Sequence, residues 1–498
     1  MIETYEYVGR WWLPEDEETK LAGTLTIARG GARLNVVGHF GHTVLGGTGD
    51  ETVYSPHPAD VPRILGETTN GKAITLETCS STDFHLSFPG IATATYKPTF
   101  VLLDVWFTPG EEVTFDEIAI RTSDLDMWVG VSGIKGQMHT RPDPSTGQAT
   151  LDAIDIHFKP PPPVTIPLDN GDEARVGFGF HQAAWRPVTT EMGITQTASL
   201  YFRFGAPRTL KPMTRIVVQA RNFLSLAVGH PLAVLSVTGY KDDFRVPGFE
   251  HRQPIQILWQ IPHNPEKPAE ANFPGDMLFT LNEAKPSISE VMRAWFARQD
   301  IFKPVFNLYF AMLYHPSMYT DVQFLTFAQA IETYDFRRRD PHELSGTAHR
   351  RRIKGILDGA PEEWRDWLSM RLASSNYRTL DQRIRDVLGE CPTVSARIVG
   401  ATATEQNAFI RDFKNTRNYR THYTPRLERR AAHGAELYLL IVQLRAIIEM
   451  SLLRELGFAC DDIDRILDRV RRYAEIHHVR GVIAARAASG DADVDGDD

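Results

Sequence analysis

The chain of 498 residues has little cysteine: only Cys79, Cys391 and Cys460, which stand far apart. They show no paired spacing, and this excludes a cysteine-based zinc site. So few cysteines are typical of a protein of the reducing cytosol rather than of a disulfide-rich secreted protein. We expect no metal and no cofactor.

The sequence also lacks a targeting signal and an apolar run long enough for a membrane. Residues 1–6 have neither a basic start nor an apolar core, which argues against a signal peptide. The most apolar stretch, residues 437–456, is interrupted by Gln443, Arg445 and Glu449. We therefore expect a buried helix there, no membrane contact, and a cytoplasmic location.

Several catalytic and binding motifs are missing. The chain has no phosphate-cradling glycine loop followed by Lys-Ser/Thr and no Gly-x-Ser-x-Gly elbow. Residues 491–496 copy the first half of a calcium-binding loop, but the chain stops before the glutamate that such a loop needs. We interpret residues 488–498 as a disordered acidic tail. The histidine pairs 39/42 and 477/478 have no partners at metal spacing.

Net charge is −9, which argues against a general nucleic-acid binder, but the two halves differ. Residues 286–487 hold 31 lysines and arginines against 25 aspartates and glutamates, and 28 of these cations are arginine. Residues 1–285 carry a net charge of −10. Arginine suits phosphate geometry, although a GC-rich genome produces the same bias.

The first half is predicted to be β-rich. Short alternating or β-branched runs are separated by Gly- and Pro-bearing turns, a pattern typical of antiparallel sandwiches or jelly rolls without intervening helices. The predicted strands include 21–27, 32–37, 73–78, 84–88, 99–107, 199–204, 215–220, 233–238 and 255–260. Residues 160–163 are four prolines, so we expect a loop or an edge there and a possible division of this region near 160.

After residue 262 the pattern changes. Residues 263–285 are predicted to be a linker, and the hydrophobic period beyond them becomes 3.6. Helices are expected at about 287–299, 303–314, 319–338, 361–390, 405–420, 428–456 and 461–477. The overall prediction is an α+β multidomain chain: a β-sandwich or jelly-roll-like region over 1–262, the linker, and an all-α bundle over 286–487.

The best candidate site is the hexapeptide Arg417-Asn418-Tyr419-Arg420-Thr421-His422. A guanidinium can clamp a phosphate and offset charge as it develops in a transition state. An imidazole can move protons to and from a 2′-hydroxyl and a leaving oxygen. With Asn418 as an orienting amide, Arg417 and His422 are candidate catalytic residues for metal-free RNA cleavage.

The spacing of the motif limits how these groups can meet. On an ideal helix, residues five apart project roughly 140° from each other. Either the helix frays inside the motif, or two copies of the chain complete one site across a two-fold axis. Pro425 disfavours helical geometry at Thr424, so a helix end just past His422 is expected. We place the N-cap of this helix at Thr404.

These residues resemble a known family. Arg417, Asn418 and His422 match the signature of the HEPN domain, an all-α nuclease bundle, and residues 327–334 resemble an earlier helix of its ApeA-like branch. The stretch 9–14, with 21–26 and 37–40, is similar to the β-rich domain of the ApeA-like antiphage defence proteins.

The resemblance implies a homodimeric, metal-independent endoribonuclease that arrests a phage-infected bacterial cell by abortive infection. Arg417 and His422 would lie at a dimer cleft, and RNA, most often tRNA loops, would be cut by 2′-hydroxyl attack. The β-rich half would be a sensor or regulatory region that responds to a phage-derived trigger.

Two alternatives stay open. In one, the bundle only dimerises as a non-catalytic sensor or scaffold, and the β-rich half binds a phage-derived or cellular ligand. In the other, the β-rich half is a carbohydrate-binding jelly roll in which Trp11, Trp12, Trp106 and Trp128 stack on sugars.

Overall fold

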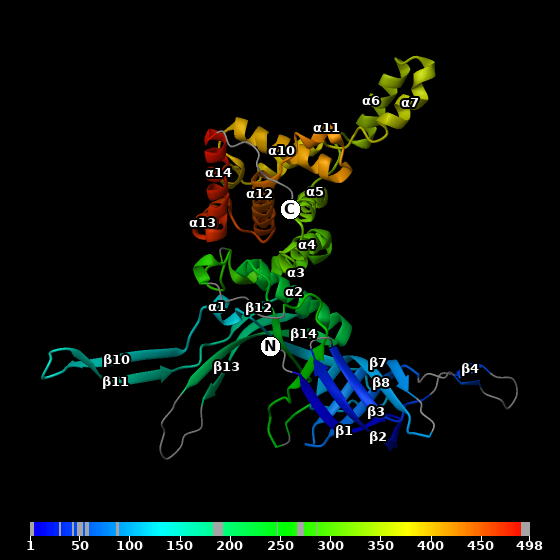
Figure 1. Ribbon diagram of the computed structural model, residues 1–498, viewed down its shortest axis with the longest axis vertical. Helices are drawn as coiled ribbons and strands as arrows, with labels where there is room; N and C mark the ends of the chain where they lie inside the picture. Colours follow the sequence, from blue (N-terminus) through cyan, green and yellow to red (C-terminus); the bar gives the residue numbers. More distant parts are fainter. Residues whose placement is uncertain are drawn as a thin grey trace. The chain divides into compact units, whose positions relative to one another are not determined.

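The computed structural model describes residues 4–28, 31–41, 44–46, 53–54, 59–85, 89–182, 193–246, 248–265, 273–284 and 286–489. The chain forms two compact units (Figure 1). The N-terminal unit comprises Met1–Ser225 and Pro231–Ala271, and the C-terminal unit comprises Leu226–His230 and Asn272–Asp498. The described strands all belong to the N-terminal unit, and the C-terminal unit is helical. The predicted order, an antiparallel β-rich region followed by a helical bundle, is confirmed.

The N-terminal unit is organised by one twelve-stranded antiparallel sheet in the order β12-β13-β14-β9-β15-β16-β8-β3-β2-β1-β6-β7. Strand β7 also pairs with β8, so the six strands from β8 to β7 close on themselves. The strands are β1 (Tyr5–Leu13), β2 (Asp16–Ala28), β3 (Gly31–Val37), β6 (Val61–Thr68), β7 (Ala73–His85), β8 (Thr93–Leu103), β9 (Thr114–Thr122), β12 (Val164–Pro167), β13 (Glu173–Gln182), β14 (Ile194–Thr209), β15 (Val234–Tyr240) and β16 (Ile255–Trp259).

Two hairpins stand outside this sheet: β4 (Val44–Gly46) with β5 (Val53–Tyr54), and β10 (Ile134–Pro142) with β11 (Ala149–Phe158). The four prolines 160–163 lie in the connection after β11, where no ladder hydrogen bond is required. Of the predicted strand 84–88, residues 86–88 lie outside the described part of the chain.

The core of the closed part is built from alternating inward-facing residues. Strand β3 alternates buried and exposed positions, and Trp11 on β1 is fully buried among its neighbours. A side chain on Gly66 of β6 would meet the Trp11 ring at 2.3 Å, so this glycine makes room for the indole. Close packing of this kind fixes the register of β1 against β6.

The suggested tryptophan platform for sugars is wrong for three of its four residues. Trp11, Trp12 and Trp128 are buried in the N-terminal unit, and only Trp106 is substantially exposed. Its indole N–H donates to the carbonyl of Gly66 at 2.8 Å. Buried indoles contribute packing and cannot stack on a sugar.

The predicted strand 215–220 is also wrong. It lies inside a 19-residue helix, α2 (Leu210–Val228), and a short helix, α1 (Leu125–Val129), occurs earlier. Ile216, Val217, Ala220, Phe223 and Leu224 are buried at helical spacing. The β-branched run dominated a window of six residues, whereas the helical period appears only over the longer segment.

The C-terminal unit contains twelve α-helices among the described residues, and α12 is its central element. The helices are α3 (Ile288–Ala297), α4 (Gln299–Tyr314), α5 (Thr320–Arg338), α6 (Gly346–Asp358), α7 (Glu362–Leu372), α8 (Leu380–Leu388), α9 (Pro392–Val399), α10 (Ala403–His422), α11 (Pro425–Glu428), α12 (Gly434–Glu455), α13 (Cys460–Arg469) and α14 (Arg471–Ser489). The predicted apolar stripe on α12 is buried and packs against α5 and α14.

Several predicted helix limits require correction. The predicted helix 361–390 is divided into α7 and α8, the predicted helix 461–477 is divided at Val470, and α6 and α9 were not predicted. Helix α6 has no buried residue, so it carries no core-facing signal that a periodicity argument could detect. No helix in the described part of the chain has the length and apolar character needed to cross a membrane.

Parts of two other predicted segments are described. Within the predicted linker 263–285, Met277 and Leu278 are buried in the C-terminal unit, where the Leu278 amide donates to Ala227 at 2.7 Å. Residues 266–272 and 285 lie outside the description, as does the predicted acidic tail from residue 490 onward.

A fully buried carboxylate, Glu449, sits in the middle of α12. It accepts hydrogen bonds from the hydroxyls of Tyr309 at 2.8 Å and Tyr473 at 2.5 Å. Arg445 and Arg472 pair with it at 3.0 and 3.3 Å. Burial alone would raise the pKa of Glu449, but the two guanidinium groups and two hydroxyls outweigh burial and lower that pKa to about 2.

The lowered pKa of Glu449 predicts how the stability of the protein depends on pH. Because the folded pKa is depressed from 4.5, its contribution is present above pH 4.5 and is lost as the pH falls toward 2. At pH 7, Glu449→Gln should lower the free energy of unfolding by about 3 kcal/mol. Urea unfolding of both proteins should show this difference shrinking below pH 4.5. A difference that stays constant down to pH 3 contradicts the assignment.

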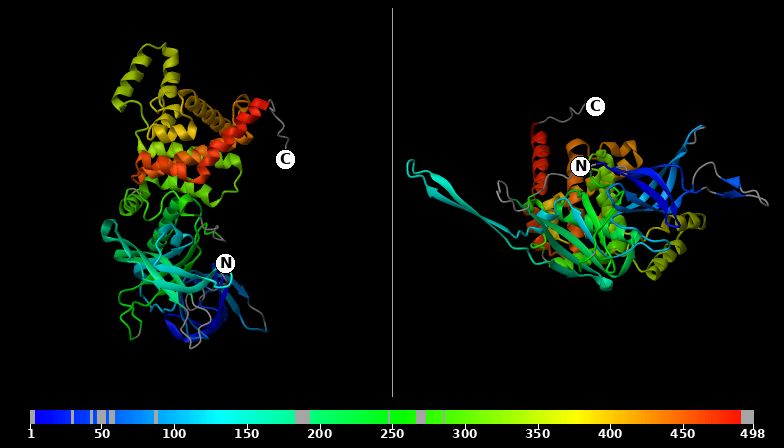
Figure 2. Two further views of the ribbon diagram at one scale, coloured as in Figure 1. Left: turned by 90° about the vertical axis from the view of Figure 1, so that its left-hand side faces the viewer. Right: turned by 90° about the horizontal axis from the view of Figure 1, so that it is seen from below.

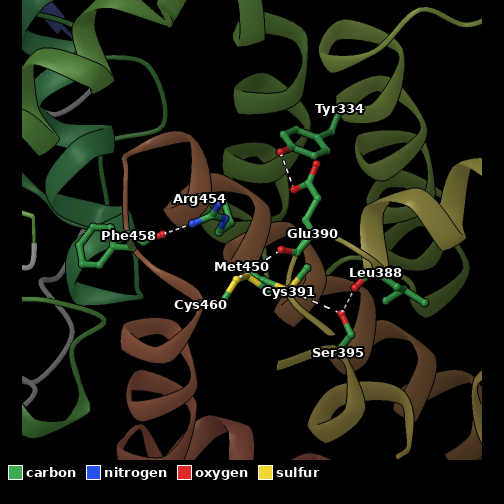
Figure 3. Close-up of a disulfide and its surroundings, with 9 residues drawn as sticks. All are labelled: Tyr334, Leu388, Glu390, Cys391, Ser395, Met450, Arg454, Phe458 and Cys460. Carbon is green, nitrogen blue, oxygen red and sulfur yellow. Dashed lines mark hydrogen bonds between the residues drawn. A yellow bond between two sulfur atoms is a disulfide. The ribbon is translucent and has the colours of Figure 1, made fainter. Parts of the chain in front are cut away.

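Two of the three cysteines are paired, although their spacing in the sequence gave no sign of a pair. A disulfide joins Cys391, just before α9, to Cys460, the first residue of α13, with their Cα atoms 5.4 Å apart. Figure 3 shows it beside Glu390, whose carboxylate accepts the Tyr334 hydroxyl at 3.0 Å. Cys79 is free and buried. The partners are 69 residues apart, and only the packing of α9 against α13 brings them together.

The disulfide predicts how many free thiols the chain has with and without reductant. Denatured without reductant, the chain should titrate one free thiol, from Cys79, and three after reduction. Replacing Cys391 and Cys460 by serine should lower the free energy of unfolding by about 2–4 kcal/mol, because the cross-link restricts the unfolded chain. Reductant should bring wild type to the level of this variant and leave the variant unchanged. Three thiols without reductant would rule the bond out.

Candidate functional site

The hexapeptide lies on the last turns of α10, a 20-residue helix with a defined start. Its N-cap is Thr402, not the predicted Thr404. The Thr402 hydroxyl accepts from the Glu405 amide at 3.2 Å, and the Glu405 carboxylate accepts from the Thr402 amide at 2.8 Å. This reciprocal capping box is the Thr-x-x-Glu pattern, which fits residues 402–405.

The end of α10 lies where Pro425 predicts it. The helix continues through His422, and Tyr423 follows with a left-handed φ of 46°. Pro425 then opens the short helix α11. Because α10 stays helical throughout the motif, fraying inside it is wrong as an explanation of how the catalytic groups meet.

Helical geometry therefore decides which motif residues share a face. Asn418 and His422 are four residues apart and lie on one side of α10. Arg417 and His422 project about 140° from each other, so one copy of the chain does not bring them together. The His422 side chain is exposed, and none of the hydrogen bonds or ion pairs among the described residues involves it.

Arg417 is held by a carboxylate from another helix. Its Nε lies 3.1 Å from Oε1 of Glu332 on α5, and Nη2 lies 3.5 Å from Oε2. Nη1 lies 3.5 Å from Oδ1 of Asn418. The Arg417 side chain keeps 33% of its surface exposed, so the guanidinium is oriented but still reachable from solvent.

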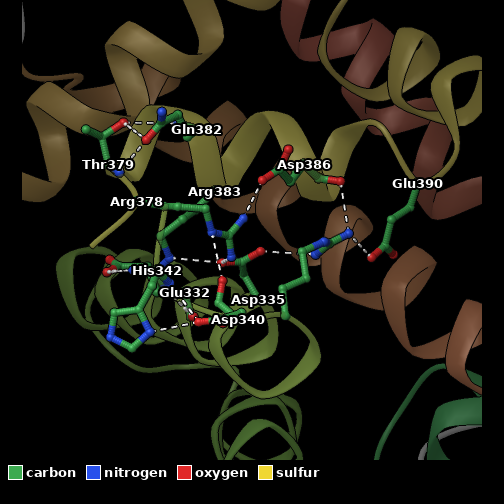
Figure 4. A network of polar contacts seen from close by, with 11 residues as sticks. Glu332, Asp335, Asp340, His342, Arg378, Thr379, Gln382, Arg383, Asp386 and Glu390 are labelled. Carbon is green, nitrogen blue, oxygen red and sulfur yellow. Dashed lines mark hydrogen bonds and ion pairs between the residues drawn. The ribbon is translucent and has the colours of Figure 1, made fainter. Parts of the chain in front are cut away.

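Glu332 belongs to a larger network of ion pairs (Figure 4). Arg383 on α8 approaches Glu332 at 3.6 Å and Asp335 at 3.0 Å. Asp335 is almost fully buried and also receives Arg339 at 3.0 Å and Arg378 at 2.8 Å. Several arginines around one buried carboxylate hold α5 and α8 in a fixed relation, and with them the partner of Arg417.

A second ion pair anchors the α5-facing side of α10 one turn further along. Arg420, only 11% exposed, pairs with Asp321 at the start of α5 at 2.7 Å. The Thr416 hydroxyl accepts from the amide of Ala432 at 2.9 Å, beyond α11. Two contacts to α5 and one across the following turn leave α10 little freedom to rotate about its axis.

Sequence reasoning missed Glu332 as the partner of Arg417. Glu332 stands 85 residues away in the chain, and neither its spacing nor its neighbours indicate the contact. Glu332 lies between the buried Ile331 and the half-buried Thr333, at the edge of the core-facing side of α5. This position indicates a partner on α10 only when the packing of α5 against α10 is known.

Comparison with protein families identifies both halves of the chain. Residues 6–295 match the ApeA N-terminal domain 1, and residues 325–462 match the Apea-like HEPN domain. The chain belongs to the ApeA family. The HEPN match contains Glu332 and the whole α10 motif, and it places this ApeA-family chain among HEPN nuclease-type antiphage defence proteins. Comparisons with curated proteins and with solved structures gave no significant match.

The Glu332–Arg417 contact can be tested without any activity in this ApeA-family protein. A double-mutant cycle with Glu332→Ala and Arg417→Ala should give a coupling energy of about 0.5–2 kcal/mol in unfolding experiments, because either change removes the same ion pair. Arg411→Ala, an exposed arginine of α10 that pairs with Asp412 instead of Glu332, serves as the control partner and should add to Glu332→Ala without coupling. Additive effects of the Glu332 and Arg417 changes would contradict the contact.

Proposed function

We propose that the chain is a metal-independent endoribonuclease of antiphage defence, with Arg417, Asn418 and His422 as its catalytic residues. One observation carries the proposal. Within the region that matches a HEPN domain, α10 presents Asn418 and an exposed His422 on one face, beside a guanidinium that Glu332 orients.

His422 is assigned the proton transfers. A neutral imidazole takes the proton of a ribose 2′-hydroxyl, and the resulting oxygen attacks the adjacent phosphorus. The bond from phosphorus to the 5′-oxygen breaks, and a proton is delivered to the leaving oxygen. The products are a 2′,3′-cyclic phosphate and a 5′-hydroxyl, so no water is consumed in this step.

Arg417 is assigned the phosphate. A guanidinium carries five N–H donors; the Glu332 carboxylate engages Nε and one side of Nη2, and Asn418 engages one side of Nη1. The remaining donors can bind the non-bridging oxygens, which become more negative in the transition state. Glu332 is a positioning residue, and Asn418, at hydrogen-bond distance from Arg417 and on the face of His422, orients both groups.

The angular separation of Arg417 and His422 favours a site shared by two copies of the chain. A two-fold axis can bring the Arg417 face of one copy to the His422 face of the other, so we propose a homodimer with a composite cleft. Attack in line with the leaving oxygen needs an unpaired linkage, which favours RNA loops, tRNA loops among them.

The N-terminal unit is assigned the regulation of this nuclease. We propose that it recognises a phage-derived trigger in the bacterial cytoplasm and releases RNA cleavage that arrests the infected cell. Its support is the ApeA N-terminal match and the net charge of −10 over residues 1–285, a charge that disfavours RNA binding by this part.

A non-catalytic sensor or scaffold is the second candidate. The ion pair between Arg417 and Glu332 favours it, because the same contact also serves a purely structural bundle. The two candidates differ in what they predict for His422, whose side chain forms no hydrogen bond or ion pair with another residue that the structure describes.

The nuclease proposal predicts RNA cleavage that persists in EDTA. His422→Ala and Arg417→Ala should each reduce the cleavage rate at least about 100-fold, because a proton-transfer group or a transition-state clamp is lost. RNA ends sequenced after expression should carry 2′,3′-cyclic phosphates in wild type only. His478→Ala is the matched histidine control and should keep full activity. Cleavage retained in both site variants would remove the assigned site, whereas a wild-type protein that cleaves no RNA would favour the scaffold.

A further inference from the structure

Helices α6 and α7 form a projection from the C-terminal unit. We call residues 346–372 the helical arm. Neither helix has a buried residue, and Figures 1 and 2 show the pair standing clear of the other helices of this unit. A 13-residue α6 makes the arm about 20 Å long. The arm adds nothing to the hydrophobic core, so core packing does not explain its two tryptophans and its arginines.

The base of the arm is rigidly attached near the candidate site. Asn376 grips Leu344 with two hydrogen bonds, accepting from its amide at 3.0 Å and donating to its carbonyl at 2.8 Å. His342 and Tyr377 form a β-bridge beside it. The next residue, Arg378, pairs with Asp335 at 2.8 Å. The arm is therefore rooted in the same ion-pair network that holds Glu332, the partner of Arg417.

Helix α6 carries unpaired positive charge. Arg350, Arg351 and Lys354 are exposed, and no ion pair between described residues includes them. They occupy a sector of about 100° on one side of the helix. Arg352 points elsewhere and pairs with Glu343 at 3.6 Å. A cluster of free cations attracts a polyanion, and its binding is then salt-dependent.

Helix α7 carries exposed aromatic rings. Trp364 and Trp367 keep 50% and 49% of their surface exposed, and their rings meet edge-on at 6.0 Å. The Arg371 guanidinium lies 5.9 Å from the Trp367 ring, on the same side of the helix. The Trp364 indole N–H donates to the carboxylate of Glu363 at 2.9 Å, so its ring is held in place at the surface. Tryptophan is usually well buried, so two half-exposed indoles, one of them beside a cation, indicate a surface that a partner covers.

We propose that the helical arm binds unpaired nucleotides of an RNA, with Arg350, Arg351 and Lys354 on phosphates and Trp364 and Trp367 stacked on bases. Free cations and sequence-tolerant aromatic stacking are the two components of single-strand binding. The proposal rests on the proposed function, since it supplies a docking site for the substrate of Arg417 and His422. The charge of α6 favours RNA over an apolar protein partner or a second copy of the chain.

The test uses the full chain with His422→Ala, so that the RNA stays intact during binding measurements. Replacing Trp364 and Trp367 by alanine should weaken binding of single-stranded RNA at least about tenfold, and replacement by phenylalanine should restore most of it. Replacing Arg350, Arg351 and Lys354 by alanine should reduce the slope of log affinity against log salt by about 2. Arg352→Ala, whose cation is already paired, is the matched control and should change neither quantity.

Each other outcome has a definite meaning. Unchanged RNA affinity in both arm variants overturns the proposal, as does equal loss of duplex RNA binding in the tryptophan variant. A monomer in sedimentation after the tryptophan changes shows that the arm instead covers a second copy. The arm substitutions are also made in the protein that keeps His422. If they leave the cleavage rate unchanged, the proposed role of the helical arm is contradicted and the nuclease is not. If RNA binding depends on the arm but no RNA is cleaved, the nuclease is contradicted and the arm is not. Circular dichroism confirms that the variants fold.

Discussion

The ion pair between Glu332 on α5 and Arg417 on α10 is the contact on which the functional account depends. Of the two arginines in the hexapeptide, Arg417 keeps 33% of its side chain exposed, whereas Arg420 keeps 11%. Arg417 is therefore the one that is both held by a carboxylate and open to solvent. A guanidinium fixed in advance needs little reorganisation when charge develops on a phosphate, which is the condition for electrostatic stabilisation of a transition state. Without Glu332, the same side chain would be one more mobile surface arginine.

The surroundings of this pair explain why it can be rigid. Buried Asp335 binds three arginines, which join α5 to α8 and to the base of the helical arm. Deeper in the unit, Glu449 and its two arginines and two tyrosines bind α4, α12 and α14 together. Buried charges of this kind cost desolvation and are stable only when fully paired, so they favour one arrangement of the helices over others. The candidate site is built on that fixed arrangement.

Patterns over a few neighbouring residues predicted the features that depend on neighbouring residues alone. The stripe on α12 and the end of α10 before Pro425 follow from periodicity and backbone sterics, and the structure confirms both. The α10 motif could be located by its residue types, but its geometry could not. Glu332 and Arg417 meet across 85 residues, and Cys391 and Cys460 across 69, so neither contact leaves a signal at short spacing. The strand expected at 215–220 failed because helical burial of α2 overrode a β-branched run.

The central claim is that one cleft takes its arginine and its histidine from different copies of the chain. The most direct measurement mixes the Arg417→Ala and His422→Ala proteins, co-expressed so that dimers form at random, and follows RNA cleavage. Half of the dimers are then mixed, and each retains one intact site of two, so the mixture should reach about one quarter of the wild-type rate although each variant alone is inactive. A mixture no more active than either variant would contradict a shared site.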